Sequence, residues 1–386
     1  MGAFARFLLV LAAGYASAAS LGKLVPHLDW LTRAYGVPLA FAGFAVSCMM
    51  LPGALAGWTL GAIVDRLGAR RVAVAGLLVT AAASLASAFG PGFAALVAIR
   101  IAEGFGYSML VISATVMIVS LARTQGALAL SVWSSFAPIG FALGQWAGAY
   151  AAGPDPLRPI GMTHAAVLVL AALCLRFGFG EVRASRAPPS REALRFPPAL
   201  WSALSMGIVC GILLAAVALA PVVLSAKTGL AVATTASLTA LAALPSIVGR
   251  FAPGWALQRG VTALAFFIGA SVVAAASLLG SLLAPVPLWL ALVLFALFQI
   301  SAGALPGLLS AMLPHVAPAP GALGTVTGMS NQMANLGNLL GPPLVLALYA
   351  MAGTVAALTV LVALYVASVA ALAGLTVFRR DLRQAG

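Results

Sequence analysis

Long apolar runs, separated by short stretches rich in Gly, Pro and charged residues, follow one another along the whole chain. A helix needs about 20 mainly apolar residues to cross the hydrocarbon core of a bilayer. Twelve runs have about this length or more, so the pattern predicts an all-α protein with twelve membrane-spanning helices. The predicted spans cover residues 5–28, 38–64, 71–89, 92–121, 127–151, 162–179, 199–224, 231–257, 262–283, 287–313, 322–350 and 354–378.

The composition agrees with this class. Of 386 residues, 63% are hydrophobic and only 7% are Asp, Glu, Lys or Arg, whereas a soluble domain has about 25% charged residues. This excludes a soluble enzyme, a disordered chain and a nucleic-acid-binding domain. The net charge of +13 does not point to nucleic acid, because most of the basic residues lie in the connections between spans.

The positions of these basic residues predict the orientation. With a cytoplasmic N-terminus, fourteen basic residues fall on the inside: Arg6, Arg66, Arg70, Arg71, Arg123, Arg176, Arg183, Arg186, Arg191, Arg195, Arg259, Arg379, Arg380 and Arg383. Four fall outside: Lys23, Arg33, Arg158 and Lys227. The positive-inside rule therefore predicts that both termini are cytoplasmic.

One polar connection, residues 181–198, divides the chain into two predicted six-helix bundles, 1–180 and 199–386. A constant offset of 193 residues aligns parts of these halves without gaps. It places Leu51-Pro52 on Leu244-Pro245 and Gly61 on Gly254, and it continues through Arg66 on Arg259, Gly76 on Gly269, Gly144 on Gly337 and Gly148 on Gly341. Internal repeats of this kind are common in transporters, whose substrate sites lie at the repeat interface.

Between the second and third predicted spans the sequence reads Gly61-Ala-Ile-Val-Asp65-Arg66-Leu-Gly68-Ala-Arg70-Arg71. This resembles the loop signature G-x-x-x-D-R-x-G-R-R of the major facilitator superfamily. Arg100 and Gly104 resemble the R-x-x-x-G motif of its fourth span. Other motifs depart from the family pattern: Gln258 stands at the repeat equivalent of Asp65, and the fifth-span Gly-Pro motif is poorly kept. The resemblance implies a transporter of two pseudo-symmetric six-helix bundles in a bacterial inner membrane.

The loop motif also has a physical interpretation. The eleventh span begins on the same side as Asp65, so the positive end of its helix dipole is expected to face this carboxylate. Gly61 allows close helix packing, and the arginines can bind helix-end carbonyls. We therefore predict a conformational latch, although Arg70 and Arg71 are equally well explained as positive-inside anchors. Its residues are Gly61, Asp65, Arg66, Gly68, Arg70 and Arg71.

Ionisable residues inside spans are candidate functional groups because they are unfavourable in hydrocarbon. Arg100, Glu103 and Tyr107 lie on one face of the fourth span. Arg100 and Glu103 either form a structural pair or serve as a substrate-binding charge and a proton-coupling carboxylate. Arg250 is another basic residue within a span, and it either lines the transport cavity or has a structural role. Lys23, near the outer end of the first span, is expected to snorkel to the interface.

Uncharged polar residues complete the predicted substrate site. In the eleventh span, Asn331, Asn335 and Asn338 form one stripe that acts as interhelical glue or as a substrate contact. Tyr15 lies deep in the first span, and Gln299 supplies an amide to the tenth. The predicted substrate-binding residues are Tyr15, Arg100, Tyr107, Arg250, Gln299, Asn331 and Asn335.

The sequence offers little for metal or redox chemistry. Its three cysteines show no disulfide or zinc spacing. Met329 and Met333 could suit Cu(I), but methionine is also an ordinary packing residue in apolar helices. No span offers a catalytic constellation, so we expect neither an enzyme nor a bound cofactor or metal.

The surplus of buried basic residues over acidic ones favours an anionic partner. We therefore expect a monomeric secondary or facilitative transporter that moves a small organic anion or polar metabolite by alternating access, with a possible coupling proton. The nearest alternative is a proton-coupled exporter of amphiphilic compounds. A Cu(I) importer using Met329 and Met333 and a non-transporting membrane sensor are more distant ones.

Overall fold

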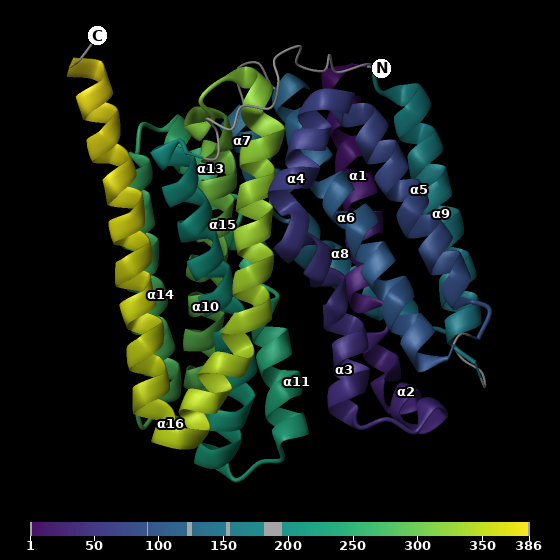
Figure 1. The fold of residues 1–386 in the computed structure, drawn as a ribbon. Coiled ribbons are helices and arrows are strands. Elements are labelled where there is room, and N and C mark those ends of the chain that lie inside the picture. Colours follow the sequence, from purple (N-terminus) through teal and green to yellow (C-terminus); the bar gives the residue numbers. More distant parts are fainter. Residues whose placement is uncertain (1, 91, 122–125, 152–154, 181–194, 385–386) are drawn as a thin grey trace. The chain divides into compact units, whose positions relative to one another are not determined.

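The computed structural model describes residues 2–90, 92–121, 126–151, 155–180 and 195–384. All regular secondary structure in these ranges is helical (Figure 1), as the apolar pattern predicts. Most of the predicted connection 181–198, including Arg183, Arg186 and Arg191, lies outside the described residues, as does Arg123.

Eleven helical segments in the described ranges are long and apolar enough to cross a membrane. The last of them, Leu323–Gly374, has 52 residues and belongs to helix α16 (Leu323–Gln384). Gly353 interrupts α16 with φ 78° and ψ −176°, a conformation that favours glycine. Figure 1 shows the chain reversing its direction within α16. The predicted eleventh and twelfth spans are therefore the two arms of this element.

The chain forms two compact units. Unit 1 contains Met1–Gly126, Ser135–Leu194 and Ala317–Gln332, and unit 2 contains Ala127–Ser134, Arg195–Val316 and Met333–Gly386. They follow the predicted halves except that two short segments, 127–134 and 317–332, are counted with the opposite half.

The helices of unit 1 are α1 (Ala3–Gly22), α2 (Leu28–Tyr35), α3 (Leu39–Ser47), α4 (Leu51–Leu67), α5 (Ala69–Ser87), α6 (Phe93–Leu121), α8 (Phe136–Ala149) and α9 (Leu157–Gly178), together with the start of α16. Unit 2 holds most of α7 (Gly126–Trp133), then α10 (Pro197–Thr228), α11 (Val232–Ala243), α12 (Ser246–Gly249), α13 (Ala252–Gln258), α14 (Ala263–Leu282), α15 (Leu288–Val316) and the rest of α16.

The repeated Leu-Pro dipeptide marks a helix break in both units. In unit 1 a 3₁₀ turn, Cys48–Met50, separates α3 from α4, and Pro52 lies in the first turn of α4. In unit 2 Pro245 lies between α11 and α12. Proline lacks a backbone N–H, so it is well tolerated at a helix start but kinks or weakens a helix when it lies in the interior. The repeat thus divides the second and eighth predicted spans at equivalent positions.

The repeated glycines are also close-packing positions. A Cβ atom on Gly144 or Gly148 of α8 would overlap backbone carbonyl oxygens of α1. A Cβ on Gly337 or Gly341 of α16 would likewise overlap carbonyl oxygens of α10. Small residues let transmembrane helices approach closely. The first and fifth spans therefore pack as the seventh and eleventh do, which supports the predicted pseudo-symmetry at the level of contacts.

Candidate functional site

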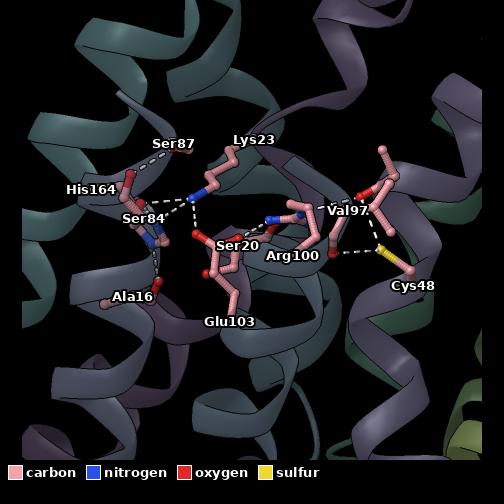
Figure 2. Close-up of polar contacts among 11 residues, drawn as sticks. Ala16, Ser20, Lys23, Cys48, Ser84, Ser87, Val97, Arg100, Glu103 and His164 are labelled. Carbon is pink, nitrogen blue, oxygen red and sulfur yellow. Dashed lines mark hydrogen bonds and ion pairs between the residues drawn. The ribbon is translucent and has the colours of Figure 1, made fainter. Parts of the chain in front are cut away.

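A buried polar cluster lies between helices of unit 1, where Lys23 and Arg100 both contact the carboxylate of Glu103 (Figure 2). Lys23, at the end of α1, is 3% exposed, and Arg100 and Glu103, both on α6, are 1% and 0% exposed. Lys23 bonds to Oε1 of the carboxylate, and Arg100 bonds to Oε2. The cluster therefore contains two basic groups for one acidic group.

The ammonium group of Lys23 has two further partners. It donates to the hydroxyl of Ser84 on α5 at 2.7 Å and to Nδ1 of His164 on α9 at 3.2 Å. The other ring nitrogen of His164, Nε2, lies 2.9 Å from the carbonyl oxygen of Ala16. Because that carbonyl can only accept, the proton of a neutral His164 lies on Nε2, so Nδ1 is the accepting nitrogen. Nδ1 also lies 3.1 Å from the Ser84 hydroxyl, so Lys23, Ser84 and His164 form one hydrogen-bonded group.

The guanidinium group of Arg100 holds α6 against two other helices. Its Nε donates to the carbonyl of Ala45 on α3 at 3.0 Å, and its Nη2 donates to the carbonyl of Ser20 on α1 at 2.8 Å. With Nη1 on Glu103, each of its three nitrogens has a partner. Buried charges require such compensation. Both the structural pair and the functional reading of Arg100 and Glu103 are compatible with this position.

Two members of the cluster were not among the predicted site residues. The expectation that Lys23 snorkels to the interface is wrong, because its side chain turns inward to Glu103. His164 was not singled out, although it is one of only three histidines and lies inside the predicted sixth span. The rule that selected Arg100, that an ionisable group within a span needs a partner, would have found it.

The other candidates of unit 1 lie on α6, on α1 and on the start of α16. Tyr107, one turn beyond Glu103 on α6, is 7% exposed and its ring lies 6.2 Å from that of Phe136. Tyr15 on α1 and Asn331 on α16 are half-buried. Met329 is buried in unit 1, whereas Met333 belongs to unit 2.

Unit 2 contains the remaining predicted substrate-binding residues. Arg250, half-buried at the end of α12, donates from Nη1 to the carbonyl of Ser134 at 2.8 Å. Gln299 on α15 is 2% exposed, and its amide nitrogen has no hydrogen-bond partner among the described residues. Asn335 on α16 is 5% exposed.

Asp65, at the end of α4, binds the first turn of α16 as the sequence predicts. The backbone amides of Gly324 and Thr325 donate to its two carboxylate oxygens at 2.8 Å each, and the Thr325 hydroxyl donates to Oδ2 at 2.7 Å. Asp65 is 7% exposed. A carboxylate at a helix N-terminus satisfies amides that have no partner within the helix and interacts favourably with the helix dipole.

Four glycines bring α4 and α16 together beside this carboxylate. A Cβ on Gly61 would overlap the carbonyl oxygen of Gly324, and a Cβ on Gly328 would overlap that of Gly57. Each helix therefore presents two glycines four residues apart, on one face. The contact depends on the absence of side chains at these positions.

The other residues of the loop motif lie at the ends of α4 and α5. Gly68 precedes α5 with φ 89°, in the region that favours glycine. Arg70 donates from Nη1 to the carbonyls of Arg176 and Phe179, at 3.3 and 3.2 Å. Arg66 and Arg71 are exposed. Arg70 thus binds the carbonyl end of α9, which is one of the interactions expected for these arginines.

Unit 2 contains a contact that is the repeat equivalent of the one between Gly61 and Gly324. The 193-residue offset relates Gly61 to Gly254 and Ser131 to Gly324. In the structure, the Ser131 hydroxyl accepts from the amide of Gly254 at 3.1 Å and donates to the carbonyl of Arg250 at 2.6 Å. In this contact the polar side chain is that of Ser131, and Gln258 stands at the position equivalent to Asp65.

Comparisons with known proteins agree with this architecture. Residues 7–225 match the sequence model described as Major Facilitator Superfamily. The search of curated proteins gives no match. The human organic anion transporter MFSD10 (TETRAN) has a similar structure, with a TM-score of 0.77 and 19% identity, over 96% of this chain and 100% of that one.

Two further solved structures resemble this chain. The fucose:proton symporter FucP of E. coli gives a TM-score of 0.75 at 15% identity, over 96% of this chain and 98% of its own. A bacterial homologue of the iron transporter ferroportin, in an outward-facing state, gives a TM-score of 0.77 at 15% identity, over 97% of this chain and 100% of its own. At these identities the likenesses establish the fold.

Proposed function

The chain belongs to the Major Facilitator Superfamily and is a membrane transporter, and from this premise we propose that it moves a small organic anion or polar metabolite by alternating access. Proteins of this architecture bind substrates near the membrane midplane, between two repeats that rock about the site. The residues proposed to bind the substrate are those predicted from the sequence, with Arg250 as the principal basic group.

The observation that carries the proposal is the imbalance of charged groups. Lys23 and Arg100 share one carboxylate, that of Glu103. Arg250 adds a basic group in unit 2, where its Nη1 donates to the carbonyl of Ser134. The carboxylate of Asp65 is already bound by amides of α16. An anionic substrate would supply the negative charge that buried basic groups favour. The similar human structure is that of an organic anion transporter.

Glu103 is our proposed proton-coupling group, and its surroundings support the role. Through Lys23 it is linked to Ser84 and His164, so a carboxylate, an amine and an imidazole lie in one hydrogen-bonded chain. Such chains of ionisable groups often serve as proton relays in membrane proteins. The same chain also supports the alternative function, a proton-coupled exporter of amphiphilic compounds.

Asp65 and its glycine neighbours are proposed as the conformational latch. The three hydrogen bonds to Gly324 and Thr325 contribute free energy only in conformations that bring α4 and the start of α16 together. A contact present in one state and absent from another biases the equilibrium between them. Loss of the latch would therefore change the distribution of states and the transport rate.

The first test is a stability screen of the purified protein. A ligand that binds only the folded state raises its apparent stability, so thermal unfolding is measured with mono-, di- and tricarboxylates, organic phosphates, and neutral sugars of similar size. We expect stabilisation by one class of anions. Stabilisation by amphiphilic cations alone would instead favour the exporter.

The second test is uptake of the stabilising anion into vesicles containing purified protein. Arg250→Ala should reduce uptake at least tenfold, because a hydrogen bond to a charged group contributes about 1.5–3 kcal/mol. Arg259→Ala is the matched control, since Arg259 is exposed in the same unit and stacks on Trp255 at 3.8 Å. Unchanged uptake in Arg250→Ala would remove Arg250 from the substrate site. A pH-sensitive dye inside the vesicles reports whether protons move with the anion.

A further inference from the structure

A surface groove of about 330 Å³ lies between α5 and α9 in unit 1, and its lining shares no residue with the buried cluster. Its lining combines two kinds of side chain: guanidinium groups from both helices, and apolar side chains from α5. The lining residues are Arg70, Arg71, Val74, Ala75, Leu78 and Arg176. Neither the transport proposal nor the latch requires Arg176 or the apolar part of this groove.

The basic end of the groove is built from the start of α5 and the end of α9. Arg70 and Arg71 lie in the first turn of α5, where the helix dipole is positive and favours anions over cations. Arg70 binds the carbonyl end of α9, which brings the exposed Arg71 and Arg176 to the same groove. Clustered guanidinium groups at a positive helix end attract an anion, and their planar donors suit a phosphate.

The apolar end extends along α5 toward the middle of the span. Leu78 is 46% exposed and lies seven residues beyond Arg71, or about 10 Å along the helix. Val74 and Ala75 lie between them on the groove wall. On a spanning helix, such exposed apolar side chains contact lipid tails. The groove therefore offers an anion-binding end and an apolar end, in the order in which a phospholipid presents its phosphate and its acyl chain.

We propose that this groove is a binding site for one anionic phospholipid, whose phosphate pairs with Arg71 and Arg176 and whose acyl chain lies along Val74 and Leu78. Basic pockets between transmembrane helices at the cytoplasmic surface bind acidic lipid head groups, and the positive-inside rule puts this end of the protein on that side. The apolar wall favours a lipid over free phosphate, which has nothing to place against Leu78. The lipid would join the start of α5 to the end of α9, close in the chain to the end of α4, which carries Asp65.

The test measures lipid retention by the detergent-solubilised full chain with native mass spectrometry. Phosphatidylglycerol, phosphatidylcholine and inorganic phosphate are added separately. We expect phosphatidylglycerol to be retained at least tenfold more strongly than phosphatidylcholine. Each arginine near an anionic lipid contributes about fivefold in affinity, so Arg71→Gln and Arg176→Gln should each weaken retention by about that factor. Arg70 is left unchanged because it binds α9.

Arg158→Gln is the matched control, since Arg158 is an exposed arginine in the first turn of the same helix, α9. It should retain phosphatidylglycerol as the wild type does. For the apolar end, Leu78→Ser should weaken retention, whereas Leu85→Ser, at another exposed position of α5, should not. Equal losses in Arg158→Gln and Arg176→Gln would overturn the proposal, as would equal retention of the two lipids.

Two measurements keep the result interpretable if a glutamine variant folds poorly. Arg71→Lys and Arg176→Lys keep the charge and should retain most of the binding. In the wild type alone, raising the salt concentration should release phosphatidylglycerol, because salt screens exposed charge pairs. If millimolar inorganic phosphate displaces the lipid completely, the site is one for free phosphate and the proposal fails.

Discussion

Thr325 donates two hydrogen bonds to one oxygen of Asp65, from its backbone amide at 2.8 Å and from its hydroxyl at 2.7 Å. The amide of Gly324 binds the other oxygen. The carboxylate therefore acts as the N-terminal cap of α16, although it belongs to α4, about 260 residues earlier in the chain. A contact between such distant segments connects the loop motif directly to the eleventh span.

Asp65→Asn should weaken this cap. The amide side chain keeps one accepting oxygen but loses the negative charge at the helix end, and it turns an NH₂ group toward a backbone donor. Loss of a cap of this kind lowers stability by about 1–2 kcal/mol. Thermal unfolding in detergent measures the effect. Thr325→Val removes only the hydroxyl bond and should have a smaller effect than Asp65→Asn; the reverse order would contradict the assignment of Asp65 as the cap.

Gly61→Ala should separate α4 from α16 because its Cβ would overlap the carbonyl oxygen of Gly324. Overpacking of a close contact lowers stability by about 1–3 kcal/mol, and here it would also lengthen the hydrogen bonds of Asp65. Gly43→Ala is the control, since a Cβ at Gly43 of α3 has no atom within 4 Å. Thermal unfolding should distinguish the two variants, and similar midpoints would show that α4 can move aside without loss.

The buried cluster should tolerate the loss of Lys23 better than the loss of Glu103. Glu103→Gln leaves Lys23 and Arg100 together without a carboxylate, and an uncompensated buried charge destabilises by about 3–5 kcal/mol. Lys23→Met leaves Arg100 paired with Glu103. Lys227→Met removes a lysine that binds carbonyls at the end of α14. It controls for the general effect of a lysine-to-methionine change on stability. The prediction fails if Lys23→Met unfolds at a lower temperature than Glu103→Gln.

Ser131→Ala should loosen the equivalent contact in unit 2. The hydroxyl accepts from Gly254 and donates to the carbonyl of Arg250. The change therefore removes one hydrogen bond from the amide of Gly254 and one from the carbonyl of Arg250. Each such bond contributes about 0.5–1.5 kcal/mol, and the expected loss is about 1–2 kcal/mol in denaturation of the purified protein. Ser120→Ala, which removes only a bond to the carbonyl of Met117 in its own helix, should change stability little.

The spans could be predicted because hydrophobic length is a property of the sequence alone. The breaks within the spans were harder to predict. Pro52 and Pro245 were recognised as repeat equivalents, but whether a proline divides its span depends on how the helix packs. Helix α16 illustrates the same point. Its two predicted spans meet at Gly353, where one residue in an unusual backbone conformation replaces a connecting loop.

The contacts of the candidate site were likewise predictable only in part. The contact of Asp65 with the eleventh span was predictable, because counting crossings places both on one side of the membrane. The pair formed by Arg100 and Glu103 was predictable from their spacing in one helix. The contact of Lys23 with Glu103 and with His164 joins residues 80 and 141 positions apart, and a single sequence carries no signal that pairs them. Side-chain direction at the end of α1 decides whether Lys23 turns inward.

The contact of α4 with α16 has a property that larger side chains would remove. Gly57, Gly61, Gly324 and Gly328 have no side-chain torsions, so at these four positions no rotamer is fixed when the helices meet. The side chains held in this contact are therefore few: Asp65 and Thr325 bind each other, and Gln332 binds the amide of Trp58. If the proposed latch opens and closes, little side-chain entropy changes at the glycine positions, and the free energy of the contact comes mainly from the hydrogen bonds of Asp65.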